Sequence, residues 1–273
     1  MSLRTVLEQR SPATLKFLLN ARSELRSLKV AYFDAPVATG GFHFRGYGAG
    51  ADEREESDVL ATRLQSCTAL IDVGSNSGYY ACLARSLGKA AIAVEPNQRN
   101  LRVLRQNLID NGWADTEVFP MALGGESGLV ALYGSGVAAS LLPGWNRASL
   151  LERELVSVTT LDALLAGRFF GQPLAIKVDV EGAELGVLDG AYATLRRSPK
   201  PTWFIEIIGS GPFSEPFNPR FAATFERMFL AGYRCHTWNR AAREVRIEDA
   251  RRWAAAGTDV DVGHNFVFSG GES

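Results

Sequence analysis

The stretch that decides the fold is Ile71-Asp72-Val73-Gly74-Ser75-Asn76-Ser77-Gly78. A short, mostly apolar run leads into a turn with the pattern G-x-N-x-G. Glycine permits a tight turn there and lets a ligand approach the backbone without a side chain in the way. The stretch therefore predicts a buried strand, a ligand-binding turn and a helix that follows the turn.

The chain on both sides of this turn alternates between helix-like and strand-like patterns. Short apolar runs such as Ala91-Ile92-Ala93-Val94 are typical of strands buried on both faces of a parallel sheet. We predict a doubly wound α/β sheet whose ligand lies at the carboxyl ends of the strands. The expected helices cover 56–65, 78–87, 98–111, 161–166, 182–196 and 218–231, and the expected strands cover 68–73, 90–94, 116–120, 128–133, 154–159, 174–180, 202–208, 233–238 and 264–268.

The N-terminal region differs from this alternation. Residues 1–30 carry leucines at helical spacing and predict two short amphipathic helices, and 34–50 suit an irregular segment or a hairpin. We expect an N-terminal extension over 1–50 and one domain over 51–273. The excess of basic residues in 1–30 fits either a membrane-surface helix or a solvated polar face, and we prefer the solvated face.

Bulk composition limits the classes of partner. The chain has 273 residues, of which 46% are hydrophobic and 22% charged, with a net charge of -1. That charge gives no reason to expect a nucleic-acid partner, which usually requires a basic face. Three widely separated cysteines form neither a disulfide nor a zinc pattern, and we see no signal peptide or membrane span. We expect a cytoplasmic protein, and the sequence leaves open whether it forms a homo-oligomer.

The glycine turn also predicts the cofactor. Its pattern is neither the dinucleotide G-x-G-x-x-G nor the phosphate-binding G-x-x-x-x-G-K-[ST]. S-adenosylmethionine (SAM) suits it, because SAM has no pyrophosphate to seat. Glu95 ends the next strand about 20 residues later, where an acid accepts hydrogen bonds from ribose hydroxyls. Asp72 is expected to orient the loop or to meet the cofactor's amino group through water.

Four further phrases follow the glycine turn in order. They are Val94-Glu95-Pro96-Asn97, Ala122-Leu123-Gly124, Val158-Thr159-Thr160-Leu161-Asp162 and Ile176-Lys177-Val178-Asp179-Val180-Glu181-Gly182-Ala183-Glu184. With the turn, the chain resembles the FkbM-type SAM-dependent methyltransferases over roughly residues 55–208. The resemblance implies a Rossmann-like, mostly parallel seven-stranded methyltransferase sheet with helices on both faces. It also implies SAM as methyl donor, S-adenosylhomocysteine as product and O-methylation of a sugar or secondary metabolite. The uncovered residues 1–50 and 209–260 are expected to hold much of the acceptor specificity.

The K-x-D-x-E phrase supplies candidate catalytic residues. Lys177, Asp179 and Glu181 alternate along the expected strand 174–180 and so share one face or edge. Asp179 either takes the acceptor's hydroxyl proton, or is a structural partner of Lys177 or a cap for the next helix. Glu206, on the next strand, is paired provisionally with Lys177. These carboxylates suit a hard cation, but no dedicated spacing indicates a metal.

Other candidates surround this phrase. His43 lies among aromatic residues and either reaches over the site or is packed, and the loop 134–140 is either a lid or a plain connection. We expect one of Tyr79 and Tyr80 at the methionine tail and the other in the core. The candidate catalytic residues are Asp179, Glu181, Glu206 and His43, and the candidate cofactor-binding residues are Asp72, Gly74, Ser75, Asn76, Gly78, Tyr79, Glu95, Pro96, Asn97, Ala122 and Asp179.

Three other functions were weighed. An NAD-dependent oxidoreductase would carry G-x-G-x-x-G, which is missing from the turn. A non-catalytic SAM-binding protein and an N-methyltransferase on a small molecule remain open. Amino-group enzymes that modify nucleic acid or protein often place N-P-P-[YF] where this chain has Asp179-Val180-Glu181-Gly182. We therefore expect an oxygen acceptor on a small molecule or glycan.

Overall fold

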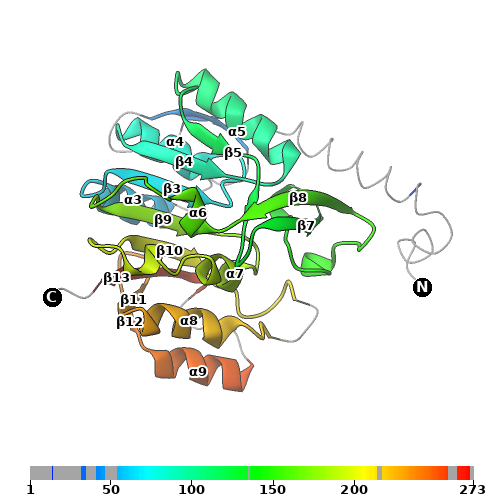
Figure 1. Cartoon of the computed structure of the whole chain (residues 1–273), viewed down its shortest axis with the longest axis vertical. Helices are drawn as coiled ribbons and strands as arrows, with labels where there is room; N and C mark the ends of the chain where they lie inside the picture. Colours follow the sequence, from blue (N-terminus) through cyan, green and yellow to red (C-terminus); the bar gives the residue numbers. More distant parts are fainter. Residues whose placement is uncertain are drawn as a thin grey trace.

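The computed structural model describes residues 14, 32–34, 41–46, 54–134, 136–213, 217–257 and 263–270. A sheet with the strand order β12-β11-β13-β10-β9-β3-β4-β5 runs through the described part of the chain (Figure 1). Its strands are β3 (Ala69–Val73), β4 (Ala90–Val94), β5 (Glu117–Phe119), β9 (Leu174–Val178), β10 (Thr202–Glu206), β11 (Tyr233–Thr237), β12 (Glu244–Val245) and β13 (Asn265–Gly270).

Most of this sheet is parallel. The neighbours from β5 through β4, β3 and β9 to β10 pair in parallel, whereas β13 and β11 join the β10 side antiparallel. The predicted doubly wound α/β sheet is confirmed. The expected count of seven strands is short by one, because β12 adds an eighth strand that has only two residues.

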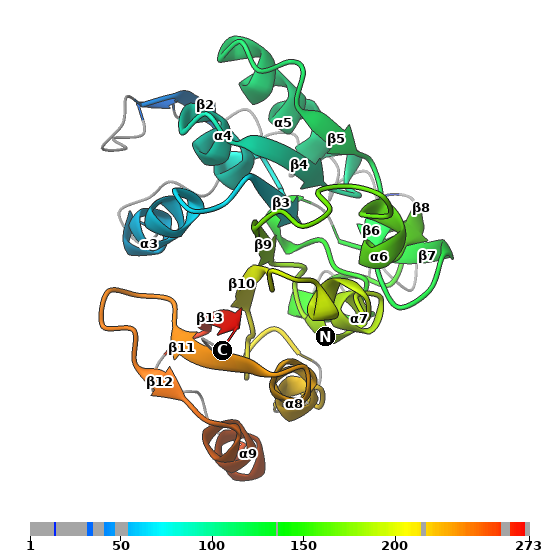
Figure 2. The ribbon, with the colours of Figure 1, turned by 60° about the vertical axis from the view of Figure 1, so that its left-hand side comes forward.

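Helices cover both faces of the sheet (Figure 2). The core cluster on one face joins the sheet to α3 (Arg54–Leu64), α4 (Tyr79–Ser86) and α5 (Gln98–Asp110). The cluster on the other face joins it to α6 (Leu161–Leu164), α7 (Glu184–Asp189), α8 (Phe221–Leu230) and α9 (Ile247–Ala256). Within β3, Leu70 belongs to the first cluster and Ile71 to the second, as the alternation of a strand requires.

A second, three-stranded sheet projects beside the main one (Figure 1). It contains β6 (Ala122–Leu123), β8 (Arg153–Thr159) and β7 (Gly128–Tyr133), in that order. The segments 128–133 and 154–159 were predicted as strands, and they pair with each other, outside the parallel sheet. Their connection contains two 3₁₀ helices, η2 (Gly136–Ala138) and η3 (Trp145–Arg147).

Two predicted elements have different bounds. The strand expected to reach residue 180 ends at Val178, because the backbone then turns through positive φ at Glu181 (56°) and Gly182 (92°). The helix expected over 182–196 is divided into α7 and the 3₁₀ helix η4 (Thr194–Arg196). Helix α9 was not predicted, although Ala250 and Trp253 are its buried positions.

The hairpin suggested for 34–50 is present as the antiparallel pair β1 (Tyr32–Asp34) and β2 (His43–Arg45). Phe42 and Phe44 are buried in the core cluster of α4 and α5. The helices predicted for 1–30 lie outside the described residues, apart from Thr14, and the division at residue 50 stays a prediction. None of the helices in the described ranges is long and apolar enough to cross a membrane.

Candidate active site

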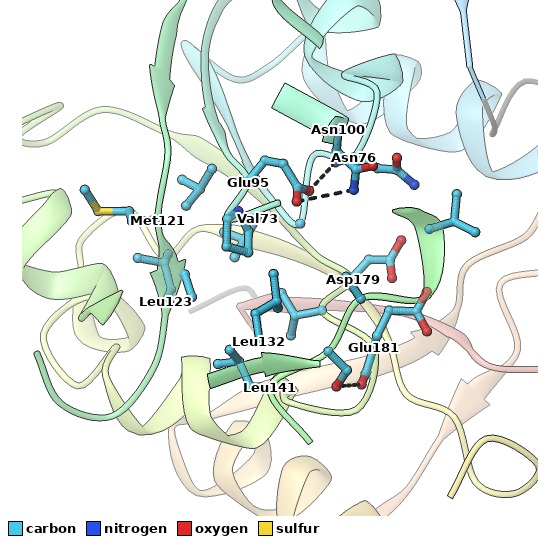
Figure 3. Close-up of a pocket in the computed structure, with 18 of the residues that line it drawn as sticks. Val73, Asn76, Glu95, Asn100, Met121, Leu123, Leu132, Leu141, Asp179 and Glu181 are labelled. Carbon is cyan, nitrogen blue, oxygen red and sulfur yellow. Dashed lines mark hydrogen bonds between the residues drawn. The ribbon is translucent and has the colours of Figure 1, made fainter. Parts of the chain in front are cut away.

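A pocket of about 570 Å³ opens where β3, β4 and β9 end (Figure 3). These strands are parallel neighbours, so their carboxyl ends meet at one edge of the sheet. The predicted candidates that line the pocket are Gly74, Asn76, Glu95, Pro96, Ala122, Asp179 and Glu181. The edge of the sheet predicted for the ligand therefore has an open pocket lined by these residues.

The two glycines of the turn serve different contacts. Gly74 has a φ of 78°, and a Cβ there would lie 1.8 Å from the backbone oxygen of Asp179. Gly78 has a φ of 86°, and a Cβ there would lie 2.9 Å from Cγ of Leu104 on α5. Gly74 thus brings the ends of β3 and β9 together at the pocket, whereas Gly78 brings α4 against α5 and does not line the pocket.

Glu95 is the acid at the β4 side of the pocket. Its Oε2 accepts a hydrogen bond from the backbone N–H of Asn76 at 2.8 Å. Its Oε1 accepts from the backbone N–H of Asn97 at 2.8 Å and from Nδ2 of Asn100 at 3.3 Å. Burial of the side chain, which is 5% exposed, raises the pKa of Glu95 to about 7. Glu95 therefore holds the glycine turn in place as well as lining the pocket.

Two predicted cofactor residues support this turn from outside the pocket. The hydroxyl of Ser75 donates to the backbone oxygen of Asp72 at 2.7 Å and accepts from the N–H of Val94 at 3.0 Å. Asn97 is the N-cap of α5, and its side chain accepts hydrogen bonds from the first helical N–H groups. Both residues position the turn, and neither lines the pocket.

The opposite wall of the pocket is apolar. Met121, Leu123, Leu132 and Leu141 come from the region of β6, β7 and the β7–β8 connection (Figure 3). These residues were missed as site residues, because their apolar side chains read as ordinary core. Their wall is suited to a flat, apolar ligand group such as an aromatic base.

At the β9 side, Asp179 pairs with Lys177. The ammonium Nζ of Lys177 lies 2.9 Å from Oδ2 of Asp179, 4.0 Å from Oδ1 of Asp72 and 4.9 Å from the centre of the Tyr80 ring. Burial favours the protonated acid, but the charge of Lys177 and the hydrogen bonds with Glu206 and Lys177 together outweigh it and hold the pKa of Asp179 below its usual value. Asp179 is therefore ionised at neutral pH.

Glu206 lies beside this pair. It shares a hydrogen bond with Asp179, and the charge of Lys177 also acts on it. The provisional pairing of Glu206 with Lys177 stays a prediction. Burial and the negative charge of Asp179 raise the pKa of Glu206. Of these two hydrogen-bonded carboxyls, Glu206 is therefore the one that holds a proton more readily. Among the described residues, no group of three or more His, Cys, Asp or Glu side chains is arranged to hold a metal ion.

Glu181 is held in a strained backbone conformation at the rim of the pocket, with a φ of 56°. Its Oε2 accepts a hydrogen bond from Nε1 of Trp145 at 2.8 Å, and its backbone oxygen accepts one from the hydroxyl of Ser140 at 2.6 Å. Burial, and then the charge of Asp179, raise the pKa of Glu181 to about 8. Its side chain is therefore fixed and largely protonated at neutral pH.

Helix α7 has no side-chain cap, and the acid that binds the backbone of the turn before it is Glu184. Glu184 accepts a hydrogen bond from the N–H of Gly182 at 2.9 Å and a longer one from the N–H of Val180 at 3.4 Å. Burial raises its pKa to about 7. Asp179 is thus free of the capping role suggested for it, and its structural partner is Lys177.

Three further candidates lie away from the pocket. His43 is exposed, and its backbone pairs with the side chain of Asn111 at the C-terminal end of α5, about 20 Å from the end beside Glu95. Tyr79 is buried against Phe42 and Phe44, so Tyr80 is the tyrosine nearer the charged pair. Asp72 belongs to β3, is fully buried and does not line the pocket.

The loop proposed as a lid reaches the pocket. The backbone oxygen of Gly136 accepts from Nδ2 of Asn100 at 3.1 Å, and Gly136, Val137, Ala139 and Ser140 line the cavity. With the bond from Ser140 to Glu181, the described part of the loop is tied to both sides of the pocket. The described part of the loop therefore forms part of the pocket lining, and its role as a lid stays a prediction.

The fold and the pocket define a class, the Rossmann-like α/β proteins that bind a ligand where the strand order reverses. Residues 72–235 match the family described as the Methyltransferase FkbM domain, and the chain belongs to that family. Hexuronic acid methyltransferase AglP of Haloferax volcanii is 32% identical over 150 residues, which are 53% of this chain and 60% of the relative.

Solved structures give weaker likenesses. The ribosomal protein L11 methylase of Lactobacillus delbrueckii subsp. bulgaricus has a TM-score of 0.42 and 10% identity, over 83% of this chain and 81% of the other. Fibrillarin of Aeropyrum pernix, in complex with natively bound S-adenosyl-L-methionine, has a TM-score of 0.39 and 12% identity, over 78% and 75%.

Proposed function

We propose that this protein is a SAM-dependent O-methyltransferase that acts on a hydroxyl of a sugar or a sugar-containing metabolite. The observation that carries the proposal is the pocket at the ends of β3, β4 and β9. It places Glu95 on one side and the carboxylates of Asp179 and Glu181 on the other (Figure 3). This arrangement suits a ligand that has a nucleoside at one end, beside Glu95, and a reacting centre at the other end, beside Asp179 and Glu181.

The residues present fit SAM. Glu95 is placed to accept hydrogen bonds from ribose hydroxyls, and the wall of Met121, Leu123 and Leu132 suits the adenine. Gly74 keeps side-chain atoms away from the turn beside Asp179. When bound, SAM supplies an electrophilic methyl group on a sulfonium. The ionised Asp179 is placed to offset that positive charge.

The residues of the chain contribute positioning and proton transfer. Methyl transfer requires the nucleophile, the methyl carbon and the leaving sulfur in line, so orientation is the main contribution. An alcohol also loses a proton as its oxygen attacks, which calls for a general base. We assign this role to Asp179, because Lys177 keeps it ionised and it lines the pocket. Glu181 is the second candidate, because it is protonated until the pH approaches 8.

The sugar acceptor is supported by the relative from Haloferax volcanii, whose name gives a hexuronic acid as its substrate. The chain spans only 60% of that relative, so a sugar acceptor for this protein is proposed by analogy with it. An N-methyltransferase on a small molecule and a non-catalytic SAM-binding protein are the alternatives. The same assay distinguishes them.

Calorimetry with SAM, S-adenosylhomocysteine and NAD tests the cofactor. We expect micromolar binding of the first two, and binding of NAD without SAM would contradict the proposal. Transfer of a labelled methyl group to a panel of sugars and to matched amino sugars then tests the acceptor. Label that is transferred to neutral sugars and resists alkali, as a methyl ether does, supports O-methylation. Label on amino sugars alone supports N-methylation. Binding of SAM without any transfer supports the non-catalytic alternative.

A further inference from the structure

A second hollow, of about 510 Å³, lies beside the proposed active site. Its apolar lining is Leu142, Pro143, Trp145, Phe213 and Pro219, and its polar residues are Asn218 and Arg220. The hollow lies between the β7–β8 connection and the segment that precedes α8. Neither segment belongs to the parallel sheet, so the hollow is formed by regions outside the cofactor-binding core.

The two segments are fastened together. The N–H of Asn146 donates to the backbone oxygen of Pro212 at 2.7 Å. The rings of Trp145 and Phe213 meet edge to face, with centroids 4.7 Å apart. Asn218 is buried, and its side chain donates to the backbone oxygen of Ile208 and accepts from the N–H of Arg220. The walls of the hollow are therefore fixed before any ligand binds.

One residue connects the hollow to the proposed chemistry. Trp145 is buried, lines the hollow and donates from Nε1 to Oε2 of Glu181 at 2.8 Å. Its ring also lies where a Cβ on Gly182 would be, 2.4 Å from Cζ3. A ligand in the hollow is thus separated from the Asp179–Glu181 end of the first pocket by a single side chain.

Arg220 provides the charge of the hollow. Its side chain is exposed, and among the described residues no carboxylate forms an ion pair with its guanidinium. Other exposed arginines nearby in the fold do have acidic partners, as Arg227 has Asp189 and Arg251 has Glu226. A guanidinium at the edge of an apolar hollow is suited to bind a carboxylate or a phosphate in a bidentate way.

We propose that this hollow is the acceptor subsite and that it takes an acidic sugar, with the apolar face of the ring against Phe213 and a carboxylate or phosphate group on Arg220. The inference rests on the proposed function, because that function places the transfer at Asp179 and Glu181. It adds a charge preference to that function. Asn218 serves as the buried support that keeps Arg220 at the edge of the hollow.

Binding of three sugars to the protein loaded with S-adenosylhomocysteine tests the proposal. The probes are methyl β-D-glucuronide, glucose 6-phosphate and the neutral methyl β-D-glucoside, titrated by NMR. We expect one or both acidic sugars to bind about tenfold more tightly than the neutral one, the ratio that a charge-assisted hydrogen bond supplies. The glucuronide and the phosphate distinguish the two sources of negative charge.

Three variants complete the test. In Arg220→Gln, the dissociation constants of the acidic and neutral sugars should lie within about two- to threefold of each other. In Phe213→Ala, every sugar that binds should bind more weakly. Arg105→Gln, which changes an exposed arginine on α5, is the matched control. It should change neither the preference for acidic sugars nor the affinity for any sugar. Equal binding of all three sugars, no binding of any, or a preference that survives in Arg220→Gln would overturn the proposal.

These outcomes are separable from a failure of the proposed function. Binding of SAM and S-adenosylhomocysteine is measured first, on the same preparation and on Arg220→Gln. If neither cofactor binds, the proposed function fails, and the sugar titration on the ligand-free protein still decides whether the hollow binds acids through Arg220. If the cofactor binds and methyl transfer to the acidic sugars is unaffected in Arg220→Gln, the charge preference alone is overturned.

Discussion

Lys177 and Asp179 form an ion pair at the point where β9 ends, with Nζ 2.9 Å from Oδ2. The pair lies beside the fully buried Asp72, which is the neighbour of Lys177 in the register of β3 and β9. One ammonium group therefore serves two carboxylates that come from adjacent strands. The arrangement connects the stability of the sheet edge to the charge state of Asp179, the proposed general base.

Removal of the Lys177 ammonium group should lower the free energy of unfolding. Lys177→Met keeps the apolar stem but leaves Asp72 and Asp179 without it, and loss of one partner of a buried pair costs about 3 kcal/mol or more. We expect a lower free energy of unfolding in a urea titration. The double variant Lys177→Met with Asp179→Asn should recover part of the loss, because the charge left behind is removed. Strictly additive effects would show that the pair is not coupled.

Glu95 should control cofactor affinity. Glu95→Ala removes the proposed acceptor of the ribose hydroxyls, and we expect SAM to bind more weakly by about 1.5–3 kcal/mol, the range for hydrogen bonds to a charged group. The same change leaves the N–H groups of Asn76 and Asn97 without their acceptor, so the melting temperature should fall as well. Calorimetry and a thermal melt check the two effects, and an unchanged dissociation constant would place the ribose elsewhere.

The affinity for SAM should also depend on pH. The pKa of Glu95 is raised to about 7, so its carboxylate ionises between roughly pH 6 and 8. Hydroxyl donors favour the ionised acid, so we expect tighter binding as the pH rises through 7 and proton release on binding below it. Glu95→Gln cannot ionise and should bind with the same, weaker affinity at every pH. Isothermal titrations in buffers of different ionisation enthalpy measure the proton release.

The parallel sheet and one side of the pocket could be predicted from sequence for a clear reason. Buried parallel strands are continuous apolar runs, and the residues that follow them are polar or glycine, so Gly74, Glu95 and Asp179 mark the ends of β3, β4 and β9. The periodicity of each run fixes where the strand ends to within about two residues. Topology then brings the three ends together without further information.

The rest of the pocket depends on contacts that a pattern does not encode. Leu123 and Leu132 of the apolar wall come from the small second sheet, and Met121 directly precedes it; the place of that sheet beside the main sheet is set by packing. The placement of His43 depends on two hydrogen bonds with Asn111, which is 68 residues away. The cap suggested for Asp179 is wrong, because α7 has no side-chain cap and Glu184 instead binds the turn before it, where Glu181 and Gly182 have positive φ.

The stability of the ligand-free protein should fall as the pH rises. Glu184 has a pKa of about 7 in the folded protein and about 4.5 when unfolded, so the folded state binds more protons between those values. Its contribution is fully present below about pH 4.5 and is lost as the pH rises through 7. Glu184→Gln should reduce this slope while keeping an acceptor oxygen for the N–H of Gly182. Thermal melts from pH 5 to 8 measure it, with the exposed Glu126→Gln as the control.

The last prediction concerns which carboxylate takes the acceptor's proton. Asp179→Asn keeps the shape of the side chain and should leave SAM affinity nearly intact. Turnover should fall by about 10²–10⁴-fold, the usual loss for a general base. If Asp179 alone is the base, turnover of the unchanged protein at saturating SAM should be level from pH 6 to 9, because Lys177 keeps the acid ionised throughout. Glu181→Gln should then have a small effect.

The contrary result has its own pH profile. If Glu181 takes the proton, turnover should rise about tenfold per pH unit below 8 and become level above it, because its pKa is about 8 and only the ionised acid accepts. Glu181→Gln would then abolish both the rate and the slope, and Asp179→Asn would lower the apparent pKa of Glu181 by removing a neighbouring negative charge. Saturating SAM is essential in both cases, because Glu95 ionises near pH 7 and would otherwise add the pH dependence of cofactor binding to that of the chemical step.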